Sequence, residues 1–353
     1  MPIPCVWSDG FRLHDPAAEI WVGVRIEGTE VAARVDAIRA SLEAAGTEFL
    51  PSHTYPEEVL HQVHEPDLVD FLRTAWNRWE TSGYLDEPGQ NRVVPYAFPL
   101  AGLTSGRPPR RAAKVGALAG MYCMDTMTLI GPGTWEGARA AAFAAITAAE
   151  LAAETQRSYY AACRPPGHHA GPNFYGGSCY LNNAALAAAR LAAAGLGAVT
   201  VIDLDAHHGN GTQEIFYRRG DVRYGSVHVD PALGWFPHYV GFADEAGEAD
   251  GRGANLNLPI APGAGDRVWL EAVEELVGFS SGCGALVISL GVDAAADDPE
   301  SPLMVSRGGY RQAGNLVGAA GLPMAIVQEG GYDLATLGSL VTAFLSGVEE
   351  AAG

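Results

Sequence analysis

Two carboxylates and two imidazoles occur within six residues, in the run Asp203-Leu204-Asp205-Ala206-His207-His208. Residues 198–202 before it are apolar and partly β-branched, which is typical of a buried parallel strand. Because alternate residues of a strand share a face, Asp203, Asp205 and His207 converge if the extended backbone continues that far. Carboxylate oxygens and imidazole nitrogens are ordinary zinc ligands, so the run predicts half of a metal site that a third protein ligand would complete.

A second pair of imidazoles, His168 and His169, follows the apolar residues 159–162 and the segment Arg164-Pro165-Pro166-Gly167. Neighbouring residues of a strand point to opposite faces. Both rings can therefore enter one site only if the backbone is irregular, as two prolines and a glycine would make it. Taken alone, the pair fits a solvated surface loop as well as a catalytic site, because exposed histidines are common.

Two more polar residues follow apolar runs further along the chain. Asp293 comes after residues 285–291 and is a candidate third metal ligand, although a lone Asp after a strand also serves as a helix N-cap or an Asx-turn. Tyr332 comes after residues 323–328 and the diglycine Gly330-Gly331. Its hydroxyl could swing over a bound substrate, or its ring could simply pack in the core.

The elements that must position these residues alternate between apolar strands and helices. Strands are predicted at residues 158–163, 198–204, 222–229, 285–291 and 323–328, and helices at 135–155 and 181–194, with Thr134 and Asn182 as helix starts. This alternation predicts an α/β fold with a central, mostly parallel sheet flanked by helices on both faces. Pro and Gly cluster at 87–109, 131–133, 164–177 and 241–265, which predicts long loops rather than an interdomain linker. We expect a single domain over residues 1–353.

Composition and charge exclude several function classes. The 353 residues are 48% hydrophobic, which is ample for a packed core. A formal net charge of −19 disfavours a nucleic-acid partner, and it either favours a cationic partner or serves solubility alone. No apolar stretch approaches the roughly 20 residues of a membrane helix, and the first residues lack a signal-peptide core, so we expect a cytoplasmic protein with no membrane partner. The five cysteines have neither disulfide nor zinc-finger spacing, which fits a reducing compartment.

In combination these segments resemble the histone deacetylase family, which shares its fold with the arginases. The motifs are Arg164-Pro165-Pro166-Gly167-His168-His169-Ala170, residues 177–183, His207-His208-Gly209-Asn210-Gly211-Thr212-Gln213 and Glu329-Gly330-Gly331-Tyr332-Asp333. They are similar to the class II-like and acetylpolyamine amidohydrolase branch, and Gly133-Thr134-Trp135-Glu136 with Leu13-His14-Asp15-Pro16-Ala17 indicates the acetylpolyamine amidohydrolases in particular. The resemblance covers nearly the whole chain. It implies a single-domain arginase/deacetylase-type fold with a long active-site and dimer loop around residues 84–115.

The resemblance implies two metal sites. Asp205, His207 and Asp293 would bind one zinc ion per chain, which would polarise a carbonyl and activate water. Iron or cobalt also suits such a nitrogen and oxygen site. A structural potassium ion is implied beside it, at Asp203, Asp205, His207, Ser226 and Val227.

The resemblance also implies the catalytic groups. His168 and His169 would be paired imidazoles, with Asp203 oriented toward the first and Asn210 toward the second. A carboxylate favours an imidazolium more than a neutral amide does, so the two imidazoles should differ in pKa. His169 would act as general base and acid, and Tyr332 would donate a hydrogen bond to the oxyanion.

The sequence departs from the family at Ser178, a position that is usually aromatic. In the family, two rings at this level line a tunnel for the methylene chain of the substrate. Phe236 would be the remaining ring, and Gly177 lies beside Ser178. Loss of one wall could admit acyl groups or amines bulkier than acetyl and a linear alkyl chain, unless Trp235 fills the gap.

Two charged segments near the expected tunnel mouth carry opposite signs. Residues 107–114 hold three arginines and one lysine, which would repel a polyamine or belong to a solvated loop or a dimer contact. Residues 244–250 hold four acidic residues, which would attract an amine or be solvated. The sequence leaves the sign of the rim open.

The resemblance implies hydrolysis of an acetamide to an amine and acetate. Small N-acetylated amines such as acetylpolyamines are the expected substrates, and a homodimer is the expected assembly. Acetyl-lysine in proteins or an N-acylated natural product is the alternative substrate, which Ser178 and the basic loop leave open. A catalytically silent acyl-ligand binder is disfavoured because it needs no proton shuttle. An arginase-like two-metal hydrolase is disfavoured because the sequence offers too few bridging aspartates.

Overall fold

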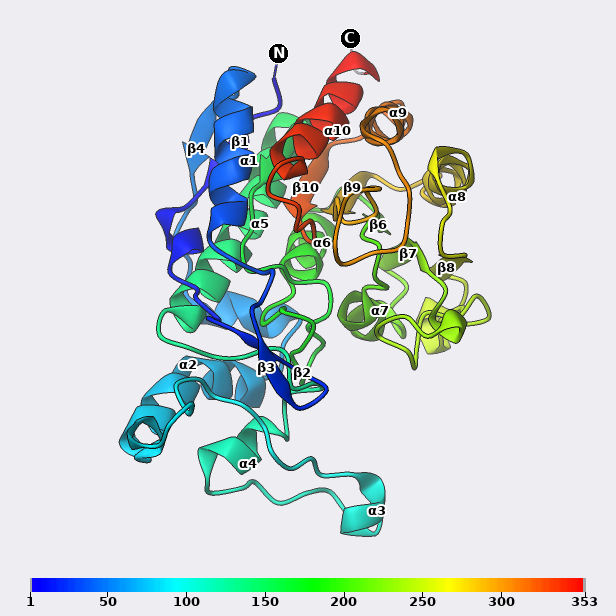
Figure 1. Cartoon of the computed structure of the whole chain (residues 1–353). Helices are drawn as coiled ribbons and strands as arrows, with labels where there is room; N and C mark the ends of the chain where they lie inside the picture. The colour runs from blue at the N-terminus through cyan, green and yellow to red at the C-terminus, as the bar shows by residue number, and fades with distance from the viewer. Residues whose placement is uncertain (1, 352–353) are drawn as a thin grey trace.

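Figure 1 shows the computed structural model of the protein, which describes residues 2–351 and contains a central sheet of eight strands. The strands are β1 (Cys5–Trp7), β4 (Phe49–Pro51), β5 (Ser158–Ala161), β6 (Val199–Asp203), β7 (Val222–Val229), β8 (Asn255–Ile260), β9 (Ala285–Leu290) and β10 (Met324–Gln328). Their order is β4-β1-β5-β10-β9-β6-β7-β8, and neighbouring strands are parallel. A separate antiparallel hairpin consists of β2 (Glu19–Trp21) and β3 (Val24–Ile26).

Helices cover both faces of the sheet. Every residue of the central strands β6, β9 and β10 is therefore buried. α5 and α6 pack against central strands, and α1, α10, α9 and α8 pack side by side in that order. The α/β fold predicted from the sequence is confirmed. The helices are α1 (Ala33–Ala44), α2 (Pro66–Thr81), α3 (Ala101–Thr104), α4 (Val115–Ala119), α5 (Thr134–Thr155), α6 (Asn183–Ala193), α7 (Asn210–Phe216), α8 (Asp266–Phe279), α9 (Arg307–Gly318) and α10 (Leu337–Ala351).

The five predicted strands are present, but the sheet extends further than the sequence indicates. β8 lies within residues 241–265, which the Pro and Gly content marked as loop. Its sequence alternates asparagine with leucine and contains Pro259, a pattern that an edge strand tolerates because one side of its backbone is unpaired. β1 and β4 lie at the opposite edge and are only three residues long, too short for a periodicity signal.

Only one of the two predicted helix starts acts as a side-chain cap. Asn182 is the N-cap of α6, and its side-chain oxygen accepts from the backbone N–H of Ala185. Thr134 is instead the first residue of α5, after Gly133 with φ of +77°. Its hydroxyl oxygen accepts from the backbone N–H of Gly131 and holds the preceding turn.

Residues 84–115 form a long excursion from the sheet, at the bottom of Figure 1, with α3 at its far end. The excursion exposes the large apolar side chains of Tyr96, Leu100 and Leu103. No helix among residues 2–351 is long and apolar enough to cross a membrane. All five cysteines are free thiols and buried, in agreement with the absence of disulfide spacing.

The polar residues singled out in the sequence follow β5, β6, β9 and β10, which are neighbours in the sheet. Because the strands are parallel, their carboxyl ends meet at one edge. In open α/β sheets this edge is where ligands bind. The topology therefore gathers four separate motifs into one place.

Candidate metal centre and active site

Asp205, His207 and Asp293 form a compact cluster at the carboxyl ends of β6 and β9. The Nδ1 atom of His207 lies 3.2 Å from Asp205 Oδ1 and 3.0 Å from Asp293 Oδ2. One potential ligand atom from each residue lies within 4.8 Å of the other two. The two carboxylates and the imidazole thus converge as a candidate metal site.

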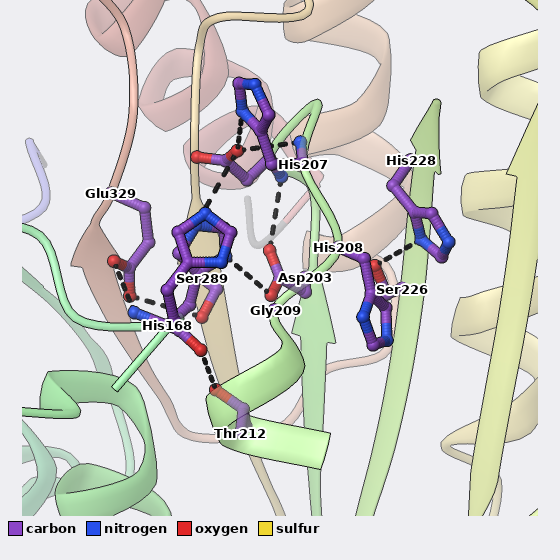
Figure 2. Close-up of polar contacts among 12 residues, drawn as sticks. His168, Asp203, His207, His208, Gly209, Thr212, Ser226, His228, Ser289 and Glu329 are labelled. Atoms are coloured by element: carbon purple, nitrogen blue, oxygen red, sulfur yellow. Dashed lines mark hydrogen bonds and ion pairs between the residues drawn. The ribbon is translucent and has the colours of Figure 1, made fainter. Parts of the chain in front are cut away.

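Strand alternation is the wrong reason for this convergence. β6 ends at Asp203, and the backbone N–H of Asp205 then donates to Asp203 Oδ1 at 3.2 Å. This turn separates the side chains, so His207 lies beside Asp205 and Asp293. Asp203 points instead to His168 (Figure 2). Asp203 therefore belongs to a different part of the site from the other two.

The electrostatics of the cluster favour a cation. Asp205 and Asp293 are 1% and 0% exposed. Burial and the charge of Asp205 raise the pKa of Asp293 to about 7. Burial opposes the imidazolium of His207, but hydrogen bonds to both carboxylates outweigh it and hold the pKa of His207 well above its usual value. Without a cation, the two buried carboxylates must hold protons to avoid facing each other as like charges. A divalent ion would neutralise both, so these residues fit such an ion.

The paired imidazoles lie beside this cluster, on the loop after β5. The ring centroids of His168 and His169 are 4.0 Å apart. The Nδ1 atom of His168 lies 3.1 Å from Asp203 Oδ2, and the Nδ1 atom of His169 lies 2.7 Å from Asn210 Oδ1. These are the two partners that the resemblance implied.

The different partners give the imidazoles different charges. Burial would lower the pKa of His168, but the carboxylates of Asp205 and Asp203 outweigh it and raise the pKa to about 10. Burial and the positive charges of His168 and His207 hold the pKa of His169 well below its usual value. One imidazole is therefore charged and the other neutral near pH 7, which suits an electrostatic role for the first and proton transfer for the second.

A buried carboxylate that the sequence analysis did not assign holds the histidine loop in place. Glu329 Oε2 accepts from the backbone N–H of Gly167 at 2.6 Å. It also accepts from the backbone N–H of His168 at 3.1 Å (Figure 2). Glu329 directly follows β10 and is fully buried. Its place in a Glu-Gly-Gly-Tyr motif was the only signal, and a motif does not tell which backbone groups a carboxylate will meet.

The segment after Glu329 brings Tyr332 to the same site. The backbone N–H of Gly330 donates to Asp205 Oδ2 at 2.8 Å, and a Cβ atom at Gly330 would lie 2.4 Å from Asp293 Oδ2, so no larger residue fits. Gly331 has φ of +124°, which favours glycine. Tyr332 then lines the cavity above the cluster.

The cavity leads from the surface to His169 and His207 and has a volume of about 320 Å³. Its lining residues are Glu19, Trp21, Thr29, Met127, His169, Gly177, Ser178, His207, Gly234, Trp235, Phe236, His238, Pro299, Glu300 and Tyr332. All four residues predicted for the substrate tunnel are among them.

Aromatic rings line one part of this cavity and small residues another. Phe236 stands edge-on to His169, with centroids 4.9 Å apart and an interplanar angle of 86°. Trp235 lies nearly parallel to His207, with centroids 6.4 Å apart. Gly177 touches His169 so closely that a Cβ atom would lie 2.3 Å from its ring. Ser178 follows Gly177 and adds no ring.

Two carboxylates in the cavity wall, Glu19 and Glu300, were not predicted. Thr29 contacts both: its backbone N–H donates to Glu19 Oε1 at 3.4 Å, and its hydroxyl donates to Glu300 Oε1 at 2.9 Å. Burial and the charge of Glu300 raise the pKa of Glu19 to about 7. Neither residue belongs to a recognisable motif.

The charged segments considered for the rim do not line this cavity. In residues 107–114, Arg111 forms ion pairs with Asp67 and Asp70 of α2. In residues 244–250, Glu245 accepts from neighbouring backbone and amide groups, and Glu248 pairs with Arg218. The acidic side chains that line the cavity are Glu19 and Glu300, and the lining also contains His169, His207 and His238.

The residues implied for a monovalent cation are also brought together in part. Asp203 and Ser226 are paired residues of β6 and β7, and Val227 follows Ser226. The hydroxyl of Ser226 lies 2.8 Å from His228 Nδ1. The cation itself stays a prediction.

Comparison with known proteins agrees with this site. The histone deacetylase domain family matches residues 28–348. The acetylpolyamine amidohydrolase of Mycoplana ramosa is 38% identical over 347 residues, which cover 97% of this chain and 98% of the relative. The histone deacetylase-like amidohydrolase of Pseudomonas aeruginosa is 40% identical over 238 residues, which cover 63% of this chain and 61% of the relative.

A solved structure has the same fold. The crystal structure of an acetylpolyamine aminohydrolase from Burkholderia pseudomallei superposes with a TM-score of 0.92 and 34% identity, over 99% of this chain and 100% of that one. The chain therefore belongs to the histone deacetylase family and has the arginase/deacetylase-type fold. It is a hydrolase of that family.

Proposed function

We propose that this protein is a zinc-dependent amidohydrolase that removes acetyl groups from small N-acetylated amines with a second, cationic amine, such as acetylpolyamines. One observation carries the proposal: a single cavity connects the Asp205, His207 and Asp293 cluster with the carboxylates of Glu19 and Glu300. The cluster would take part in the reaction, and the two carboxylates would bind the positively charged amine of the substrate. Full-length similarity to proteins named acetylpolyamine amidohydrolases supports the same substrate class.

Asp205, His207 and Asp293 would hold one zinc ion per chain, since their oxygen and nitrogen donors suit it. When bound there, zinc polarises a carbonyl group and lowers the pKa of water toward about 7. Iron or cobalt would suit the same donors, so the metal loaded in the cell is an experimental question.

The paired imidazoles would move the protons. His169, which is neutral, would take a proton from the attacking water and return one to the leaving nitrogen. His168, held positively charged by Asp203, would stabilise negative charge in the transition state. The hydroxyl of Tyr332 would donate a hydrogen bond to the acetyl carbonyl oxygen as negative charge develops on it.

Glu19 and Glu300 would select the amine. Both are half-buried in the cavity wall, where a carboxylate attracts an ammonium group more strongly than it does in open solvent. The net charge of −19 would favour the approach of the same cationic substrates.

A broader substrate range is the alternative, and Ser178 supports it. The wall at Gly177 and Ser178 contains no ring, so a bulkier acyl group, an acetyl-lysine side chain or an N-acylated natural product could fit beside Phe236. Trp235 supports a narrower substrate range, because its ring also lies in the cavity wall.

We also propose a homodimer, in which the exposed apolar residues Tyr96, Leu100 and Leu103 of the segment 84–115 meet a second copy. We further propose that a structural potassium ion lies beside Asp203 and Ser226. We also propose that the protein is cytoplasmic. The buried free thiols agree with a reducing compartment.

Acetate release by the zinc-loaded protein tests the function. The panel contains N-acetylputrescine, N-acetylcadaverine, N-acetylspermidine, an acetyl-lysine peptide and a bulkier acyl-lysine reporter. We expect turnover of the small acetylated amines, and a loss of about 100- to 1,000-fold in kcat in Tyr332→Phe. Tyr239→Phe, at an exposed tyrosine, is the matched control. Preference for the peptide or the bulky acyl group would favour the alternative, and no turnover of any substrate would overturn the proposal.

A further inference from the structure

A buried carboxylate outside the cavity, Glu30, lies between two arginines that reach different catalytic loops. Its Oε1 accepts from Arg34 Nη1 at 3.0 Å, and its Oε2 accepts from Arg164 Nη2 at 3.0 Å. The imidazole of His14 lies 3.3 Å from Oε2 on a third side. All four side chains are at most 2% exposed, so water does not screen these charges.

One arm of this network leads to the paired histidines. Arg164 is the first residue of the segment that continues into His168 and His169. Besides its bond to Glu30, its Nη1 donates to the backbone carbonyls of Phe11 at 2.8 Å and His14 at 2.9 Å. The beginning of the histidine loop is therefore anchored by a guanidinium that forms an ion pair with Glu30.

The other arm leads to Tyr332. Arg34 Nε donates to the carbonyl of Gly331 at 2.6 Å, and Nη2 donates to the carbonyl of Glu329 at 2.6 Å. The guanidinium carbon also lies 4.6 Å from the centre of the Tyr332 ring. Arg34 thus supports both the backbone and the ring of this loop.

Glu30 is the only carboxylate among the described residues that forms an ion pair with either arginine. Its removal would leave two guanidinium groups buried without a counter-charge, side by side. Buried like charges repel strongly, and an unpaired buried ion must move toward water or toward another acceptor. Each displacement would pull a different catalytic loop.

We propose that Glu30 is a positioning residue that fixes the His168–His169 loop and the Tyr332 loop relative to each other through Arg164 and Arg34. The inference rests on the proposed function for the roles of these loops. Glu30 would affect turnover and hold the two loops rigid, but it would contact neither the substrate nor the metal.

The variant Glu30→Gln keeps the size of the side chain and removes its charge. We expect kcat for N-acetylputrescine to fall by about 10- to 100-fold, because a shift of about 1 Å between reacting groups has effects of this size. KM should stay within about 3-fold and zinc content should be unchanged, because Glu30 touches neither the cavity nor the metal ligands. Combined with Tyr332→Phe, Glu30→Gln should cost less than in the wild type, since part of its effect acts through Tyr332.

Hydrogen exchange provides a readout that does not need turnover. In Glu30→Gln, backbone amides of residues 164–169 and 329–332 should exchange faster. Leu42→Ala is the matched control, because Leu42 is a buried residue of the same helix as Arg34 and its truncation lowers stability without touching a charge. If Glu30→Gln does not fold, Glu30→Asp is the second variant, which keeps the charge and shortens the side chain. It should speed exchange in the same two segments, but by less.

Unchanged kcat in Glu30→Gln, or faster exchange no different from that of Leu42→Ala, would overturn the inference. A wild-type protein that hydrolyses no acetylated amine would overturn the proposed function. The exchange experiment would still decide whether Glu30 holds the two loops, so the two failures are distinguishable.

Discussion

The Nδ1 atom of His169 lies 2.7 Å from the amide oxygen of Asn210. The neighbouring His168 has the carboxylate of Asp203 in the equivalent place. Burial and the positive charges of His168 and His207 hold the pKa of His169 well below its usual value, whereas the carboxylates of Asp205 and Asp203 raise the pKa of His168 to about 10. The carboxylate of Asp203 favours the charged form of His168, and the neutral amide of Asn210 brings no such charge to His169.

The substitution Asn210→Asp should move the pH dependence of the reaction. A carboxylate in this place would raise the pKa of His169, and a general base works only when it is unprotonated. The acidic limb of kcat/KM against pH should therefore shift to higher pH, by about one unit or more. Zinc content and thermal unfolding serve as controls. An unmoved acidic limb would mean that His169 is not the base.

The substitutions Glu19→Gln and Glu300→Gln should weaken the binding of cationic substrates selectively. We expect KM for N-acetylputrescine to rise about 3- to 10-fold in each variant, the size of one lost charge-assisted hydrogen bond in a half-buried site. N-acetylbutylamine, which has the same length but no ammonium group, is the matched control and should be unaffected. Equal effects on both substrates would contradict recognition of the charge.

The pKa of Glu19 also predicts a pH dependence of binding. Since this pKa is raised to about 7, the carboxylate is ionised above pH 7 and gains a proton as the pH falls. The ammonium group of the substrate stays charged throughout this range. KM for N-acetylputrescine should therefore increase as the pH falls through 7, and the increase should be absent in Glu19→Gln. A KM that is independent of pH in the wild type would show that Glu19 does not bind the ammonium group.

Removal of the metal should abolish activity, and one equivalent of zinc per chain should restore it. The expectation follows from the cluster of Asp205, His207 and Asp293, whose His207 lines the cavity. Asp293→Asn should weaken zinc binding by about 10-fold or more, because it removes a charged ligand. Metal analysis by mass spectrometry checks both. Two equivalents would indicate an arginase-like pair or use of the second donor cluster, His168, Cys179 and Glu329.

The substitution Ser178→Phe should narrow the cavity. If the wall at residue 178 is open, kcat/KM for a bulky acyl-lysine reporter should fall about 10-fold or more, and that for N-acetylputrescine should be maintained. Trp235→Ala is the complementary variant, and it should improve turnover of the bulky reporter if Trp235 fills the gap. If neither variant changes the ratio of kcat/KM for the two substrates, neither Ser178 nor Trp235 controls the width of the cavity.

Five strands and the meeting of polar residues at one edge of the sheet were predictable because their signals are local, whereas the roles of those residues were implied only by the resemblance. The apolar runs that became β5, β6, β7, β9 and β10 are continuous in the sequence, and polar residues that directly follow parallel strands must meet at one edge of the sheet. The short edge strands β1 and β4 escaped prediction because three residues carry no periodicity, and β8 because its alternating asparagines and Pro259 resemble a loop.

The sequence by itself determined which carboxylates, imidazoles and hydroxyl groups follow each strand, because this depends only on residue type and on spacing within single segments. Spacing alone placed Asp203, Asp205 and His207 on one face, and the resemblance paired Asp203 with His168. Only the tertiary structure shows the turn after β6 that separates the two carboxylates. It also decided which carboxylates line the cavity and which side chains hold the loops that carry His168, His169 and Tyr332. Thr29 and Glu300 are 271 residues apart, and Glu30 and Arg164 are 134 apart. Contacts of this range arise from packing between elements, and no local pattern encodes them.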